Sequence, residues 1–221
     1  MGAAIGEILG NAVGVAISPV PIIAVILMLF TAKAVSNSLS FLAGWVIGLS
    51  VAGAIVLALG LESSEGGEST TSGWIKIVIG VLFLGLAWKQ WSSRPVGDEE
   101  PTMPGWMQAI DQFTAPKSFG IGFLLSAVNP KNLGLTIAAM TKVTAAGLST
   151  GEEIGTLVVF VVIASLTVAA PVVLNLILGS KAQSALNTMK DWLAENNNTV
   201  MTVLFVVLGA KLLGDGIAVV A

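Results

Sequence analysis

The chain has 221 residues, of which 55% are hydrophobic and only 10% are charged, and its mean hydropathy is +0.91. This composition excludes an ordinary soluble domain and is typical of a polytopic membrane protein. The net charge of −3 leaves no basic patch for nucleic acid, and the absence of cysteine and histidine excludes thiolate chemistry and zinc sites of the usual ligand types.

The first apolar run, Ala3–Phe30, contains the sequence Ser18-Pro19-Val20-Pro21 near its middle. A proline has no backbone N–H, so these two prolines leave the carbonyls of Val15 and Ile17 without their helical donors. A continuous helix is not expected there, and we predict a first span that is broken at mid-depth.

Five further apolar runs of membrane-spanning length follow. They are Leu39–Gly60, Trp74–Trp91, Ser118–Val143, Ile154–Leu178 and Thr199–Val219. In the second span, Gly44, Gly48 and Ala52 recur every four residues, and such a stripe of small residues allows another helix to approach closely. That helix belongs either to the same subunit or to the second copy in a homodimer.

The longest connection between spans marks the predicted boundary between two halves. It divides the chain into residues 1–95, 96–117 and 118–221. Within it, Pro104–Thr114 places Trp106, Ile110 and Phe113 on one helical face, which predicts a short helix lying in the membrane interface. A second amphipathic connector is expected at Lys181–Leu193, before the last span.

The fourth span carries the most informative motif, Asn129-Pro130-Lys131-Asn132. Pro130 breaks the helix here and releases the carbonyl of Ser126, while two amides and one ammonium lie at a depth without bulk water. Such backbone must line a protein-walled or water-filled cavity. Lys131 then holds the helix break in one geometry by pairing with freed carbonyls, or contacts a substrate, or does both.

Two proline-broken spans at corresponding places in two halves of a chain indicate a transporter site between inverted repeats. The third and sixth spans also match, because Val81-Leu82-Phe83 aligns without gaps with Val203-Leu204-Phe205, and Lys89 then aligns with Lys211. Shared apolar composition is the alternative explanation of this match. With three spans per half, we expect an all-α integral membrane protein of six transmembrane helices in two inverted three-helix repeats.

Lysine and arginine are distributed unevenly over the two sides of such a protein. One side is assigned Lys33, Lys89, Arg94, Lys117, Lys181 and Lys190, and the other side Lys76, Lys142 and Lys211. The positive-inside tendency then predicts that the first side is cytoplasmic and that both termini are extracytoplasmic.

Three phrases carry a resemblance to a known family. They are Ser18-Pro19-Val20-Pro21-Ile22-Ile23, the stretch from Gly122 to Leu133 (GFLLSAVNPKNL), and the stretch from Leu208 to Gly216 (LGAKLLGDG). The chain resembles the GAP family of peptidoglycolipid addressing proteins, small bacterial membrane proteins placed in the lysine exporter superfamily. This resemblance implies six spans in two inverted repeats. It also implies movement of glycolipids or related envelope lipids from the inner leaflet of the plasma membrane outward.

The candidate substrate pathway consists of polar and proline positions in the spans. These are Ser18, Pro19, Pro21, Asn129, Pro130, Lys131, Asn132 and Asn175. A lysine at mid-depth suits an anionic or phosphate-bearing group, or a coupling proton. Neither proline motif contains a carboxylate, so metal transport is disfavoured and no metal site is expected. Pro171, one turn before Asn175, is expected to cause only a kink.

An enzyme is not expected from these residues. A Ser18–Lys131 dyad is the one nucleophilic arrangement left open, and no Gly-rich phosphate loop for ATP, or other cofactor motif, is present. We therefore expect an exporter of envelope lipids or of a related amphiphile, with membrane lipids as partners. The alternatives are a small-solute exporter for amino-acid-like substrates and a non-transporting partner of a larger lipid-export complex.

Overall fold

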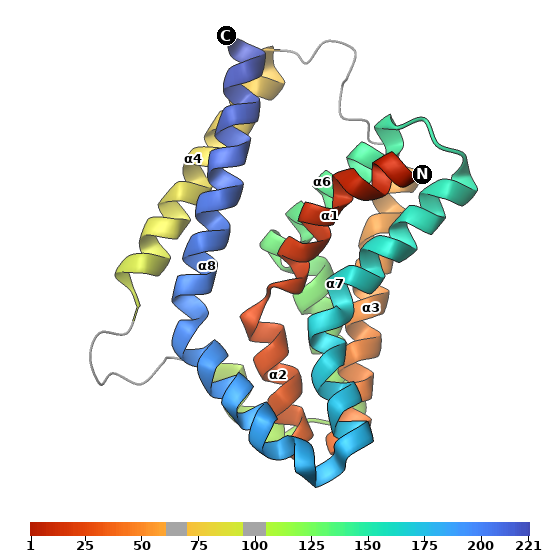
Figure 1. The fold of residues 1–221 in the computed structure, drawn as a ribbon, viewed down its shortest axis with the longest axis vertical. Helices are drawn as coiled ribbons and strands as arrows, with labels where there is room; N and C mark the ends of the chain where they lie inside the picture. Colours follow the sequence, from red (N-terminus) through yellow and green to blue (C-terminus); the bar gives the residue numbers. More distant parts are fainter. Residues whose placement is uncertain (61–69, 95–104) are drawn as a thin grey trace. The chain divides into compact units, whose positions relative to one another are not determined.

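The computed structural model describes residues 1–60, 70–94 and 105–221, and these residues form helices and turns with no strand among them (Figure 1). The α-helices are α1 (Gly2–Ala16), α2 (Pro19–Leu29), α3 (Ala34–Ala58), α4 (Thr70–Ser92), α5 (Ala115–Phe123), α6 (Pro130–Ala145), α7 (Thr150–Leu178) and α8 (Gln183–Val220). Two 3₁₀ segments, η1 (Gly105–Gln112) and η3 (Gly179–Ala182), and one π-helical segment, η2 (Leu124–Val128), join them. The predicted all-helical class is therefore confirmed for the described residues.

Three stretches are long and apolar enough to cross a membrane. They are Ala34–Ala58, Gly73–Ser92 and Thr150–Val220, the last of which contains α7, η3 and α8. The pair α1 and α2, bent by 53° at its break, gives a fourth span if it is taken as one. A shorter apolar helix covers Ala115–Val128. These helices indicate a membrane protein with three or four candidate spans.

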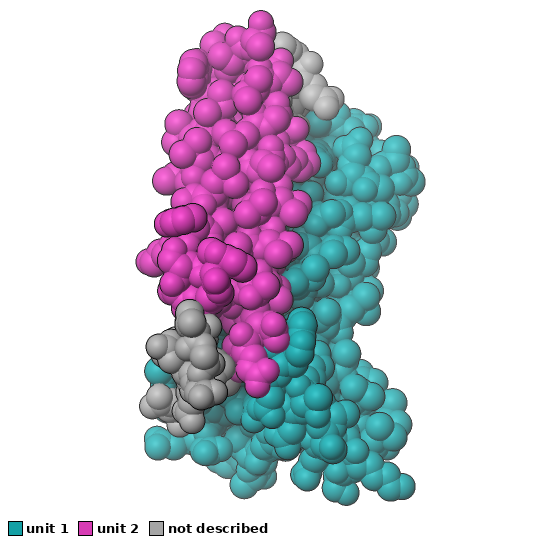
Figure 2. Space-filling model, turned by 60° about the vertical axis from the view of Figure 1, so that its left-hand side comes forward, with its two compact units in different colours: residues 1–63, 103–192 teal, residues 64–102, 193–221 magenta. Residues whose placement is uncertain are grey.

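The chain divides into two compact units, which Figure 2 shows in different colours. Unit 1 combines Met1–Ser63 with Met103–Trp192, and unit 2 combines Ser64–Thr102 with Leu193–Ala221. Each unit thus contains elements from both predicted halves of the chain. The boundary predicted at residues 96–117 separates two repeats in the sequence, whereas the two units are defined by contacts in the structure. The boundary therefore stays a prediction.

In unit 1, α3 packs against α5, η2 and α6, while α7 packs against α1 and α2, and α3 and α7 also pack against each other. The glycine stripe explains how closely α3 approaches α5. A Cβ atom on Gly44 would overlap the carbonyl oxygen of Phe119, and one on Gly48 would overlap Ser126 Oγ. The predicted close approach is therefore confirmed, and its partner is a helix of the same chain.

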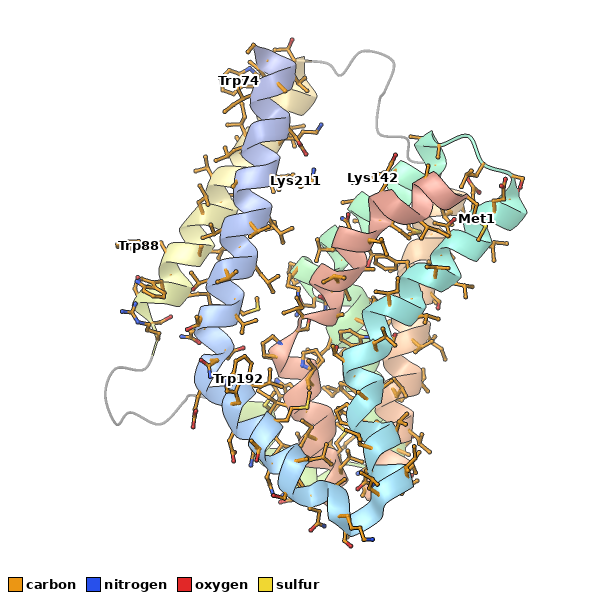
Figure 3. All side chains as sticks on the ribbon, in the orientation of Figure 1. Met1, Trp74, Trp88, Lys142, Trp192 and Lys211 are labelled. Carbon is orange, nitrogen blue, oxygen red and sulfur yellow. The ribbon has the colours of Figure 1, made fainter. Side chains whose placement is uncertain are left out.

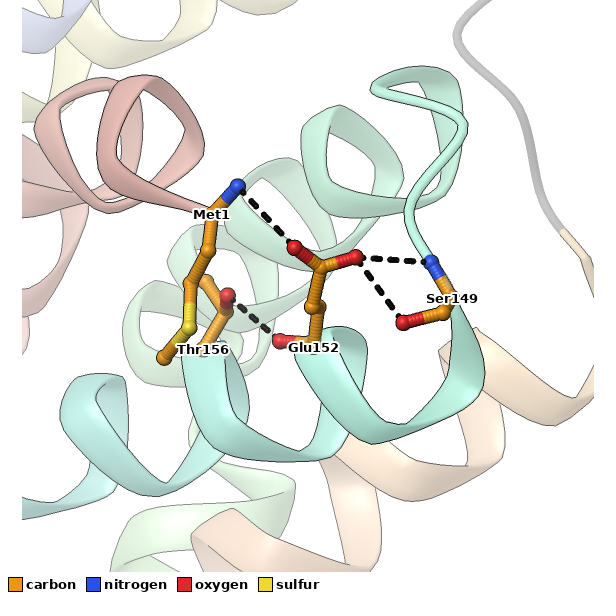
Figure 4. Close-up of polar contacts among 4 residues, drawn as sticks. All are labelled: Met1, Ser149, Glu152 and Thr156. Carbon is orange, nitrogen blue, oxygen red and sulfur yellow. Dashed lines mark hydrogen bonds and ion pairs between the residues drawn. The ribbon is translucent and has the colours of Figure 1, made fainter.

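The N-terminal end of α7 is fixed by a capping box. Ser149 donates to Glu152 Oε2 from its backbone N at 3.2 Å and from its Oγ at 2.8 Å (Figure 4). The other oxygen of this carboxylate lies 3.7 Å from the amino group of Met1, so the start of α1 is tied to the start of α7. Both helices then run toward the break at Ser18.

The segment η1 differs from the predicted interfacial helix. It is a 3₁₀ helix, and it packs against α2. Met107, Ile110 and the adjoining Phe113 are buried, and the ring of Trp106 stacks on Phe113 with centroids 6.5 Å apart. The apolar face that the sequence predicted is present, but packing inside unit 1 occupies it.

In unit 2, α4 and the C-terminal part of α8 run side by side and antiparallel (Figure 1). Phe83 and Phe205 contact each other with ring centroids 5.6 Å apart, and Thr202 Oγ1 lies 3.5 Å from the carbonyl oxygen of Ala87. Trp74 and Trp88 lie toward opposite ends of α4 and are well exposed, as expected of residues at the two membrane–water interfaces (Figure 3).

One prediction about α8 is wrong. The amphipathic connector expected at Lys181–Leu193 is not a separate element, because α8 continues without interruption from Gln183 to Val220. In this part of α8, Leu186 and Leu193 are buried.

Candidate functional site

The first helix break lies between α1 and α2. α1 ends at Ala16, Ser18 has extended backbone angles (φ −127°, ψ 95°), and Pro19 begins α2. Pro19 is favourable at this first helical position because the missing N–H would have no helical acceptor there. The predicted break of the first span is thus confirmed at the predicted residues.

The second break lies between η2 and α6. The backbone widens into the π-helical turn of η2, in which Asn129 N donates to the carbonyl of Leu124 at 3.1 Å. Asn129 then caps α6, since its Oδ1 accepts a hydrogen bond from Lys131 N at 3.0 Å, and Pro130 is again the first helical residue. The two breaks therefore share one construction: a polar residue with non-helical backbone followed by a proline that starts a helix.

The two breaks meet through side chains of α6. Lys131 Nζ donates to the carbonyl oxygen of Ile17 at 2.8 Å and to Ser18 Oγ at 2.6 Å. Asn132 Oδ1 lies 3.2 Å from Ser18 Oγ. Ser18, Lys131 and Asn132 are all buried, with 5%, 8% and 1% of their surfaces exposed. We call these three residues the crossing cluster.

Side chains also take up the other carbonyls that the breaks release. Ser18 Oγ lies 2.7 Å from the carbonyl oxygen of Val15, and Thr167 Oγ1 donates to that of Ala16 at 2.6 Å. On the other break, Asn132 Nδ2 donates to the carbonyl of Leu125 at 2.9 Å. A serine hydroxyl has one hydrogen, so Ser18 donates to Val15 or to Asn132 but not to both at once.

The Lys131 ammonium has no negatively charged neighbour among the described residues. Its acceptors are a neutral carbonyl and a neutral hydroxyl. Of the elements packed around it, α2, α3 and η2 contain no ionisable side chain, and α5 adds only Lys117. The remaining groups are Lys142 in α6 itself, Glu7 in α1, and Glu152 and Glu153 at the start of α7. Glu7 is eleven residues from Ser18 along α1, about 16 Å at the helical rise.

The helices α1 and α6 approach the crossing cluster antiparallel to each other. Lys142 Nζ donates to the carbonyl of Glu7 at 3.3 Å, and a Cβ atom on Gly14 would lie 3.0 Å from Leu135 Cδ1. In each contact, the α1 residue precedes Pro19 by as many positions as the α6 residue follows Pro130. The separation is twelve residues for Glu7 and Lys142, five for Gly14 and Leu135, and one for Ser18 and Lys131. The contacts are therefore symmetric about Pro19 and Pro130.

The other predicted pathway residues lie around the cluster or away from it. Pro19 and Pro21 are buried in the first turn of α2, Asn129 is half-buried, and Pro130 is exposed. Asn175 is half-buried in α7, eight residues beyond Thr167 and therefore about 12 Å further along the helix. α7 continues through Pro171 without a break, in agreement with the expectation that this proline causes at most a kink.

Thr167 is the functional candidate that the sequence did not reveal. A threonine within an apolar helix usually bonds to the carbonyl one turn earlier in its own helix, so its presence alone predicts nothing. Its contact with Ala16 joins residues 151 positions apart and depends on how α7 packs against α1.

Comparison with protein families gives a match over most of the chain. The family described as Sap, sulfolipid-1-addressing protein, matches residues 8–218, which is nearly the whole chain. Comparisons with curated proteins and with solved structures gave no significant match.

Proposed function

The chain belongs to the sulfolipid-1-addressing protein family, and from this membership we propose that it exports an envelope lipid with an anionic head group across the plasma membrane. The head group binds at the crossing cluster. Family membership supports a role in lipid addressing, and the single observation that carries the site is the Lys131 ammonium, buried without a counter-ion among the described residues.

An anionic ligand would complete the bonding of Lys131. An ammonium carries three N–H donors, and the described residues supply acceptors for two of them. A buried charge is costly unless it is paired, and an intramembrane lysine is by default a candidate functional group. A sulfate, phosphate or carboxylate oxygen at this position would supply both the missing acceptor and the missing negative charge.

We also propose that the site lies between two inverted repeats of three spans each. This arrangement counts α7 and α8 separately and takes α5, η2 and α6 as one broken span. The symmetric contacts of α1 and α6 about Pro19 and Pro130 support it. So does unit 2, where Phe83 and Phe205, which are equivalent in the aligned sequences, contact each other. Broken spans of corresponding position place transporter sites near the membrane midplane.

The first prediction tests the site with a variant of Lys131 and a control variant of a second lysine. Lys131→Met keeps most of the side-chain stem and removes the charge, so we expect export of a labelled anionic lipid from liposomes containing the purified protein to fall about tenfold or more. A hydrogen bond to a charged group contributes roughly 1.5–3 kcal/mol, and about 1.4 kcal/mol corresponds to tenfold. Lys117→Met, at an exposed position of α5, is the control and should leave export close to that of the unaltered protein.

The melting temperature of the same variants separates binding from structure. Lys131→Met leaves the carbonyl of Ile17 without its donor in either case, so the melting temperature should fall. If Lys131 only holds the break in place, export falls no further than the folded fraction of the variant does, whereas a binding role lowers export by the folded protein itself. Full export by a stably folded Lys131→Met variant would reject the proposed site. Failure of the unaltered protein to move any lipid by itself would favour the non-transporting partner of a larger complex.

A further inference from the structure

The four half-helices around the two breaks are packed asymmetrically. Under the proposed repeat, α1 corresponds to α5 with η2, and α2 corresponds to α6. α1 packs along α6, whereas the equivalent pair, α2 and α5, shares no extensive interface, although both helices lie wholly within the described residues. The contacts of α3 and α7 with these half-helices, by contrast, occur in both repeats. The asymmetry is therefore confined to the half-helices themselves.

If α5 packed on α2 as α1 packs on α6, it would cover α2. The segment η1 packs on α2 instead. It contacts α2, and its buried residues Met107 and Ile110, with Phe113 after it, form the apolar side of the segment. One hydrogen bond to α3 anchors it, from Asn37 Nδ2 to the carbonyl oxygen of Phe113 at 3.0 Å. On this side, α2 is therefore covered by a short segment of the inter-repeat connection.

We call the α1–α6 contact and the η1–α2 contact the two closures. They differ in how completely their polar groups are hydrogen-bonded. On the α1–α6 side, Asn11 Nδ2 donates to the carbonyl of Leu135 at 3.3 Å, in addition to the contacts of Lys131 and Lys142. On the η1 side, Asn37 Oδ1 and Ser118 Oγ are fully buried and have no partner among the described residues. A 3₁₀ helix also has poorer hydrogen-bond geometry than an α-helix. Among the described residues, the η1 closure is thus held by fewer hydrogen bonds than the α1–α6 closure.

We infer that the substrate head group reaches Lys131 between α2 and α5 after η1 moves away from α2. This inference rests on the proposed function. In the complementary state, α2 packs against α5 as α1 now packs against α6, and the head group leaves on the α1–α6 side. The unpaired Ser118 Oγ supports this second state, because Ser118 is equivalent to Glu7, whose backbone holds the opposite closure through Lys142. Ser118 would then face Thr31 of the α2 end.

The symmetry identifies two diagnostic residue pairs. Gly14 and Leu135 are in contact in the present state, five residues before Pro19 and five after Pro130. Their equivalents are Ala24, five residues after Pro19, and Leu125, five before Pro130. The chain contains no cysteine, so a pair of introduced cysteines is the only pair that can form a disulfide within it.

The test is oxidative cross-linking of the full chain in membranes. We expect Gly14→Cys with Leu135→Cys to cross-link readily, and Ala24→Cys with Leu125→Cys to cross-link more slowly. Adding Asn37→Ala, which removes the anchor of η1, should accelerate the second pair several-fold. Asn198→Ala removes a comparable bond, from a side-chain amide to a backbone carbonyl, in unit 2. It belongs to neither closure, so it is the matched control and should not accelerate that pair. A third pair, Gly53→Cys with Leu157→Cys, joins α3 to α7 and should cross-link equally in all backgrounds.

Two results would overturn the inference. One is that Ala24→Cys with Leu125→Cys never cross-links while the α3–α7 pair does. The other is that Asn37→Ala and its control accelerate the cross-linking of Ala24→Cys with Leu125→Cys equally. If Asn37→Ala lowers the melting temperature too far, Ile110→Ser in η1 is used instead. Cross-linking needs no lipid, so its outcome is independent of the lipid-export assay that tests Lys131, and either proposal can fail while the other holds.

Discussion

At the residue scale, Lys131 combines two properties: it is a hydrogen-bond donor to a freed backbone carbonyl, and it is a buried charge. Its ammonium satisfies the carbonyl of Ile17, which the second proline of the first break leaves without a donor, and it also carries the one charge in the middle of unit 1 as described. A neutral donor could satisfy the carbonyl alone. Under the proposed function, the charged group binds a partner of opposite charge, which the described residues do not supply.

The second prediction supplies such a partner artificially. Asn132→Asp places a carboxylate beside Ser18, which Lys131 already contacts, so an internal ion pair should replace the anionic ligand. We expect lipid export to fall about tenfold or more, since about 1.4 kcal/mol of lost binding gives tenfold. The new ion pair should offset the lost hydrogen bond to the carbonyl of Leu125, so that the melting temperature falls no further than in the control. Asn198→Asp is the matched control, because Asn198 also donates its amide to a backbone carbonyl but belongs to unit 2. Unchanged export by the Asn132→Asp variant would show that the ammonium needs no external anion.

At the element scale, glycines decide how closely helices approach in both units. Gly44, Gly48 and Gly122 bring α3 into backbone contact with α5 and η2, and Gly80 and Gly209 do the same for α4 and α8. Since lipid is as apolar as a helix surface, such close packing is a main source of attraction between helices in a membrane. The position of η2, and with it Asn129, depends on this contact.

The third prediction compares two glycines in this packing. Gly44→Ala adds a methyl group that would overlap the backbone of Phe119, whereas Gly120→Ala on α5 meets no atom within 4 Å. Overpacking typically costs roughly 1–3 kcal/mol, so Gly44→Ala should lower the melting temperature clearly and Gly120→Ala should leave it unchanged or slightly raised. Equal melting temperatures for the two variants would contradict the close approach of α3 and α5.

The elements also show what a sequence can and cannot reveal. The loss of helical donors at Pro19, Pro21 and Pro130 is local chemistry, so the breaks and the freed carbonyls of Val15 and Ile17 could be predicted. The continuation of α8 through three consecutive asparagines could not, because a tertiary contact stabilises it: Asn198 Nδ2 donates to the carbonyl of Ser93 at 2.7 Å. The partner of the η1 face and the contact of Thr167 likewise depend on distant parts of the chain.

At the scale of the whole molecule, the proposed repeat and the direction of export depend on how the chain is inserted. Each unit contains corresponding spans from both halves: the first, second, fourth and fifth in unit 1, and the third and sixth in unit 2. Under the proposed orientation, η1 and the α2–α5 side face the cytoplasm, where an envelope lipid is available in the inner leaflet. Release would then take place on the α1–α6 side.

The last prediction tests this orientation directly. The side assigned Arg94, Lys117 and Lys190 carries six basic residues of the predicted loops and span ends, against three on the other side, which favours a cytoplasmic location for the first. A reporter active only in the cytoplasm should be active when fused after Arg94 and inactive when fused to Ala221, because three further spans separate the two positions. Activity at both positions would contradict the six-span count. Activity at Ala221 alone would reverse the orientation, and η1 would then close the extracytoplasmic side, so that the head group would leave past η1 instead of arriving there.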